Sequence, residues 1–181
     1  MRFFLLLAFL LSGFAFAGGA PASPASWPQE PLGDYTSAPD EALPAFLRRV
    51  GRVLHDYTRA NGNEACGPIG FDGLRYSVRL HTDGVPHGCA MRANDVLEGF
   101  KFTGETVHSH PWQKLLVMTP KARAWSKHYG DGNEGAPTLR NDGAGGFSRA
   151  DYASGAGWLV AKGQLLHQAD GKTTRHGPVA D

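Results

Sequence analysis

Apolar residues recur at helical spacing in the segment that follows Asp40. Acidic residues at positions 40 and 41 suit the positive end of a helix, and Gly62 follows the last periodic turn. Arginines occupy the side away from the apolar stripe, which consists of Leu43, Phe46, Leu47, Val50, Val53 and Leu54. The spacing therefore predicts a long amphipathic helix near the N-terminus, ending before Gly62.

Shorter segments with strand-type patterns follow this helix. Apolar side chains alternate along Leu74–Thr82, and Asp72-Gly73, which precedes it, is typical of a tight hairpin turn. A short second helix is predicted from Ser148 to about Ala153. The predicted strands are Ala65–Phe71, Leu74–Thr82, Val85–Met91, Phe100–His108, Leu115–Met118, Trp158–Ala161 and Gln164–Gln168. Together these elements predict an α+β fold with a mostly antiparallel sheet.

Periodicity is lost between Pro120 and Gly146, where glycines are frequent. Long loops without secondary structure are uncommon in compact domains unless they are functional or disordered. Trp125, His128 and Tyr129 are unusual in a simple linker. Two interpretations stay open for this insertion, a lid or substrate-facing segment and a surface excursion.

The N-terminal residues have the pattern of a secretory signal peptide. Met1-Arg2 precedes an apolar run, and Ala15-Phe16-Ala17 is a typical cleavage site, so residues 1–17 are expected to be removed and the protein to be periplasmic or secreted. Residues 18–39 are expected to form a disordered leader, the domain to span 40–170, and 171–181 to be a flexible tail.

Charge and hydropathy limit the classes of function that the protein can have. Removal of Arg2 with the signal peptide leaves 17 basic residues against 17 acidic ones, so no strong field favours nucleic acid or an anionic membrane. No later segment reaches the ~18 apolar residues of a membrane span. Two cysteines in an exported chain suggest a Cys66–Cys89 disulfide, although Cys66 could equally be a small buried hydrophobic residue.

Three short motifs carry candidate chemistry: Glu64-Ala65-Cys66-Gly67, His108-Ser109-His110-Pro111 and Ser148-Arg149-Ala150-Asp151. Residues two apart on a strand point to the same face, so the two histidines are expected to reach one point. A hydrolytic zinc site has three protein ligands, here two imidazoles and a carboxylate, and its fourth position is open. Each motif also has a structural interpretation, because Ser148-x-x-Asp151 is a helix-capping pattern, His-x-His can be polar alternation, and Glu64 can be an exposed loop residue.

The three motifs, in this order, resemble those of the JAB/MPN family of JAMM-motif zinc metallopeptidases, in particular its bacterial secreted or toxin-associated branch. The resemblance covers roughly residues 41–170 and implies a cytidine-deaminase-like layering of sheet and helices. It implies that His108, His110 and Asp151 bind Zn²⁺, that Glu64 is the general base, and that Ser148 stabilises the oxyanion during amide hydrolysis.

One spacing departs from the family pattern. Asp151 lies 41 residues after His110, whereas the family places this Asp about a dozen residues after the second His. The Pro120–Gly146 insertion accounts for most of the difference, and it offers Asp131, Glu134 and Asp142 as competing carboxylates. Asp151 is preferred because it alone follows a Ser at the family offset and lies on a predicted helix.

Three functions are consistent with these features. The first is an exported zinc-dependent enzyme that acts on a peptide or protein substrate by cleaving a peptide or isopeptide bond. The second is a catalytically idle JAB-like binding module of a secretion or toxin system, and the third is a cell-wall-directed amidase on the same fold. All five motif residues are present, which favours an enzyme.

Overall fold

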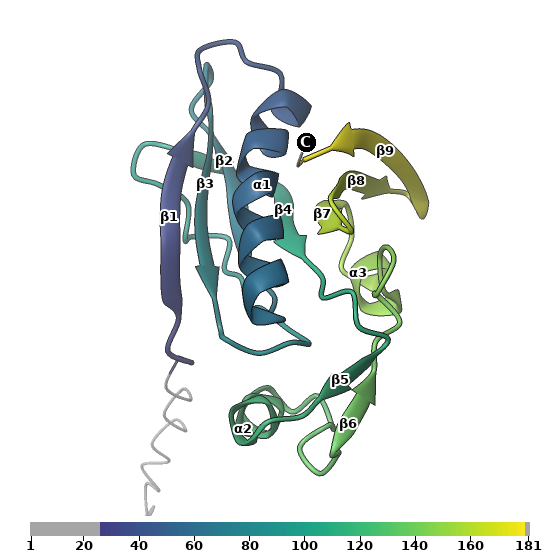
Figure 1. The fold of residues 1–181 in the computed structure, drawn as a ribbon. Coiled ribbons are helices and arrows are strands. Elements are labelled where there is room, and N and C mark those ends of the chain that lie inside the picture. The colour runs from purple at the N-terminus through teal and green to yellow at the C-terminus, as the bar shows by residue number, and fades with distance from the viewer. Residues whose placement is uncertain (1–25, 180–181) are drawn as a thin grey trace, which may run out of the picture.

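The structure of the protein, a computed structural model, describes residues 26–179. It is an α+β fold built on a seven-stranded sheet in the order β1-β3-β2-β4-β7-β8-β9 (Figure 1). Among the described strands of this sheet, β4 and β7 pair in parallel and the other neighbours are antiparallel. The strands are β1 Glu30–Thr36, β2 Cys66–Phe71, β3 Tyr76–Thr82, β4 Lys101–Ser109, β7 Gly157–Ala161, β8 Gln164–Ala169 and β9 Lys172–Pro178. The predicted fold class, with its mostly antiparallel sheet, is confirmed.

Helix α1, Leu43–Asn61, lies across one face of this sheet (Figure 1). Its apolar stripe is fully buried at Phe46, Leu47, Val50 and Leu54, and these side chains form the main core with apolar residues of β2, β3, β4, β7 and β8. The helix ends at Gly62, whose φ of 68° is the left-handed conformation common after a last helical turn. The buried stripe thus fixes the position of α1 on the sheet.

A smaller unit forms outside this sheet. Strands β5, Leu115–Val117, and β6, Thr138–Arg140, pair with each other, and helix α2, Pro120–Tyr129, connects them (Figure 1). Trp125 and Ala122 of α2 pack with Val85 and Met118 in a second core. The 120–146 insertion is therefore a folded unit and not a structureless loop, because its few apolar residues gather on one side of a capped helix.

Both ends of the domain are more ordered than their composition suggests. Within the expected leader 18–39, β1 pairs with β3, and within the expected tail 171–181, β9 pairs with β8. These two expectations were wrong for Glu30–Thr36 and Lys172–Pro178. The reason is that an edge strand is held by backbone hydrogen bonds on one side and tolerates polar side chains and proline. The predicted signal peptide 1–17 and residues 18–25 of the leader lie outside the described residues.

The strand predicted over Val85–Met91 is also wrong, because this segment has no ladder partner. It contains Pro86 and instead packs against α2, where a Cβ on Gly88 would stand 2.3 Å from the ring of Trp125. Within residues 26–179, no helix is both long enough and apolar enough to cross a membrane.

Candidate metal centre

The two histidines of the His-x-His motif converge at the end of β4. Both rings are largely buried, and their Nε2 atoms lie 3.2 Å apart. Ser109 between them points to the opposite side, where its hydroxyl is 2.6 Å from that of Thr58 on α1. Strand alternation therefore places the two imidazoles on one face, while Ser109 ties the strand to the helix.

Asp151 reaches the same point from another part of the chain. It lies in the short helix α3, Arg149–Ala153, with Oδ1 3.1 Å from His108 Nε2 and Oδ2 3.4 Å from His110 Nε2. Strand β7, which follows α3, pairs in parallel with β4, with Val107 opposite Trp158 and Ser109 opposite Val160. This pairing brings the start of α3 to the histidines despite the long insertion.

The capping interpretation of Ser148-x-x-Asp151 holds at the same time. The Asp151 backbone N–H donates to Ser148 Oγ at 3.2 Å, and Asp151 Oδ2 accepts from the Ser148 backbone N–H at 2.6 Å. The capping box orients the carboxylate, and Oδ1 faces His108. None of the competing carboxylates belongs to the group, since Asp131 contacts Ser126 and Asp142 contacts Arg149, while Glu134 is exposed.

The donor atoms of His108, His110 and Asp151 fit a metal ion. One ligand atom from each lies within 4.8 Å of the other two. Zinc bonds to N and O ligands are about 2.0–2.1 Å long, so two ligand atoms of a tetrahedral site lie roughly 3.3 Å apart. The two Nε2 atoms, 3.2 Å apart, agree with this value, and each also has one oxygen of Asp151 close by, Oδ1 at 3.1 Å from His108 and Oδ2 at 3.4 Å from His110. Two imidazoles and a carboxylate suit a divalent transition metal such as zinc, and three protein ligands would leave a fourth position of a tetrahedral site for water or substrate.

The tautomer of His110 also suits metal binding. Its Nδ1 is 3.0 Å from the carbonyl oxygens of Gly143 and Gly146, which can only accept hydrogen bonds, so Nδ1 carries the proton. The Nε2 lone pair is then free to bind a cation, and the carbonyls fix the ring orientation. This role of the loop was not predicted from the sequence. The Gly143–Gly146 run is its one signal, because a Cβ at position 143 would stand 2.5 Å from His110 Nδ1.

Glu64 lies beside the three donors without joining them. Its backbone N–H donates to Val85 O at 2.9 Å, and its carbonyl accepts from Thr82 Oγ1 at 2.6 Å, which fixes the residue just before β2. Its Oε1 is 3.8 Å from His110 Nε2. Burial raises the pKa of Glu64 to about 7; the charge of His110 opposes the shift, and those of Asp151 and Asp83 add to it. Such a carboxyl group exchanges a proton near neutral pH.

The other two candidate site residues, Asp151 and Ser148, are each held in a defined state. Burial alone would raise the pKa of Asp151, but the hydrogen bond with His108 and the charges of both histidines outweigh it and lower the pKa, so Asp151 stays ionised. The Ser148 hydroxyl lies 2.8 Å from Asp151 Oδ2 and donates to it in this arrangement. The role of Ser148 as an oxyanion donor stays a prediction.

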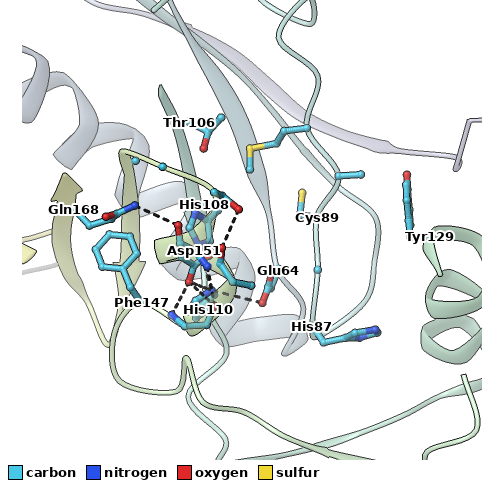
Figure 2. Close-up of a pocket in the computed structure, with 18 of the residues that line it drawn as sticks. Glu64, His87, Cys89, Thr106, His108, His110, Tyr129, Phe147, Asp151 and Gln168 are labelled. Atoms are coloured by element: carbon cyan, nitrogen blue, oxygen red, sulfur yellow. Dashed lines mark hydrogen bonds and ion pairs between the residues drawn. The ribbon is translucent and has the colours of Figure 1, made fainter. Parts of the chain in front are cut away.

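A pocket of about 430 Å³ opens directly onto these residues (Figure 2). His108, His110, Asp151 and Glu64 lie together on one side, and His87 and Tyr129 lie across from them beyond Cys89 (Figure 2). The disulfide expected between Cys66 and Cys89 is confirmed, with the Cα atoms 6.0 Å apart. It joins Cys66, at the start of β2, to Cys89, which lines the pocket. The nearby His81 lies within reach of both sulfur atoms, but these are bonded to each other.

Comparison with known proteins gave no relative. A scan against protein-family models, a search of curated proteins and a search of solved structures each found no match.

Proposed function

We propose that this protein is an exported, zinc-dependent hydrolase of the JAB/MPN type that cleaves a peptide or isopeptide bond. The observation that carries the proposal is the convergence of His108, His110 and Asp151, with the Glu64 carboxylate 3.8 Å from His110. The order of the three motifs along the chain and their positions before β2, at the end of β4 and at the start of α3 support a JAB/MPN-like layering. The disulfide fits an oxidising compartment and therefore export.

In this proposal each residue has one task. A zinc ion held by His108, His110 and Asp151 would supply a water of lowered pKa, near ~7, as the nucleophile. Glu64, largely buried and with its Oε1 3.8 Å from His110 Nε2, would take the proton from the attacking water and deliver it to the leaving nitrogen. Ser148, which lines the pocket, would redirect its hydroxyl hydrogen bond from Asp151 Oδ2 to the developing oxyanion.

Two experiments test these roles, the first for bound metal and the second for cleavage. Metal analysis of the purified protein before and after chelation should show about one zinc per chain that the chelator removes. A panel of linear and branched peptides, with whole cell walls as a separate substrate, then tests for cleavage. Protein without bound metal after zinc reconstitution would contradict the proposal.

The Glu64→Gln variant separates the general base from the metal ligands. It should keep its zinc and lose turnover by at least about a hundredfold, because general acid–base catalysis contributes on the order of 10²–10⁴-fold. Glu134→Gln is a matched control, since Glu134 is exposed and outside the pocket. Loss of zinc from Glu64→Gln, or full activity in it, would contradict the role given to Glu64.

A further inference from the structure

The pocket extends from the candidate metal centre to a wall of aromatic rings. Trp125 and Tyr129 of α2 have ring centroids 4.6 Å apart, and the ring of His87 meets Trp125 edge-on at 5.1 Å. All three line the pocket. Tyr129 is 41% exposed, so its ring presents free apolar surface to whatever enters.

This wall is held rigidly by a buried carboxylate, Asp83. Its Oδ2 accepts from Trp125 Nε1 at 2.7 Å and from the Ala90 N–H at 2.9 Å, and its Oδ1 accepts from Gln29 Nε2 at 3.1 Å. Asp83 therefore joins α2, the Val85–Met91 segment and the chain before β1. A wall fixed in this way loses little conformational entropy when a ligand packs against it.

His87 and the disulfide fix the wall further. His87 Nε2 lies 2.8 Å from Ser126 Oγ and 3.4 Å from Asp131 Oδ2, which docks the Val85–Met91 segment on α2. Cys89 binds the same segment covalently to Cys66 at the start of β2. The wall and the metal centre are thus parts of one connected framework.

The charge of the pocket restricts what it can receive. Among residues 26–179, no Lys or Arg lines it, and its two carboxylates, Glu64 and Asp151, belong to the candidate centre. A carboxylate side chain buried at the wall would find no Lys or Arg among the lining residues. The two carboxylates behind the wall, Asp83 and Asp131, already accept hydrogen bonds from Trp125 and Ser126 and do not line the pocket. Burial of an aromatic or apolar side chain against Tyr129, by contrast, favours binding, because it removes apolar surface from water.

We propose that the wall formed by His87, Trp125 and Tyr129 is a specificity subsite that receives an aromatic or other uncharged apolar side chain of the substrate beside the amide to be cleaved. This inference rests on the proposed function for the position of that amide, while the binding preference itself depends on the wall alone. The preferred substrates are then peptides with an apolar residue near the scissile bond.

Binding to the zinc-loaded Glu64→Gln protein tests the subsite without turnover. Capped hexapeptides of Ala and Gly, with Phe, Asp or Lys as the single variable residue at position three or four, would be titrated by calorimetry. The Phe peptide should bind at least about tenfold more tightly than the Asp and Lys peptides at one of the two positions. Equal binding of the three peptides, or no binding of any, would overturn the inference.

Three further variants assign the preference to the wall. Tyr129→Ala, made in the Glu64→Gln background, should remove most of the preference for Phe, whereas Tyr129→Phe should keep it. Phe102→Ala is the matched control, since Phe102 is 36% exposed and lies outside this pocket. If the preference for the Phe peptide survives in Tyr129→Ala, another part of the protein must produce it, and the inference is overturned. Selective binding without cleavage by the unmodified protein would contradict the proposed function and leave the subsite standing.

Discussion

Gly143 lies against the ring of His110 so closely that a Cβ at position 143 would stand 2.5 Å from Nδ1. The Gly143 carbonyl accepts the hydrogen bond that fixes this ring. A residue of the insertion is therefore part of the support of the candidate metal centre, although it binds no metal itself.

Gly143→Ala should weaken zinc binding. The added methyl group forces the His110 ring or the loop to move, and loss of an outer-shell partner typically costs about 10–100-fold in metal affinity. Zinc affinity is measured by competition with a chromogenic chelator. Gly145→Ala is the control in the same loop, because the nearest atom to a Cβ there is Lys162 Nζ at 3.7 Å. Equal affinities of the two variants would show that the Gly143–His110 contact does not support the site.

Asp151→Asn should lower zinc affinity by at least as much as loss of an outer-shell partner, roughly 10–100-fold. The amide keeps an oxygen that can accept the Ser148 backbone hydrogen bond but loses the charge that faces His108. Metal content after dialysis against limiting zinc gives the result. Asp142→Asn and Glu134→Gln should keep normal metal content, and a loss in either would assign the third ligand to the insertion.

Replacing both Cys66 and Cys89 by Ala should lower the free energy of unfolding by about 3 kcal/mol, the amount expected for a cross-link that closes a loop of this length. The sequence separation of the two cysteines is 23 residues. Urea denaturation of the variant and the unmodified protein gives the difference. Addition of a reductant should destabilise only the unmodified protein, and the same effect on both would indicate another cause.

The stability of the protein should fall as the pH drops below about 6.5, in part because of His87. Burial lowers the pKa of His87, and the nearby Asp131 opposes the shift only partly. Between the lowered folded-state pKa and the unfolded value of 6.5, the unfolded chain binds the extra proton, so the free energy of unfolding decreases with falling pH and is fully retained above 6.5.

The variant His87→Gln isolates this contribution. Its free energy of unfolding, measured in urea with chelator present, should change less between pH 7.5 and 5.5 than that of the unmodified protein. The chelator removes the separate pH dependence of metal binding. An unchanged slope would assign the acid sensitivity to other histidines.

Much of the fold follows from short-range patterns. The apolar stripe of α1, the alternation along β3 and the Asp72-Gly73 turn specify local structure within a few residues, and the structure forms these elements at or near the predicted positions. The edge strands β1 and β9 were not predicted, because their polar side chains carry no periodic signal and only the partner strand orders them.

The sequence by itself determined the chemistry that is available: two imidazoles on one face of a strand, a capped carboxylate and an isolated Glu, since these depend on residue identity and strand or helix geometry. Only the tertiary structure decided which carboxylate meets the histidines, because the parallel pairing of β4 with β7 brings Asp151 to them and leaves Asp131 and Asp142 outside. It also decided that the Gly-rich insertion supplies the His110 carbonyl partners and two rings of the aromatic wall, Trp125 and Tyr129. Contacts between segments far apart in the chain depend on packing that no local pattern encodes.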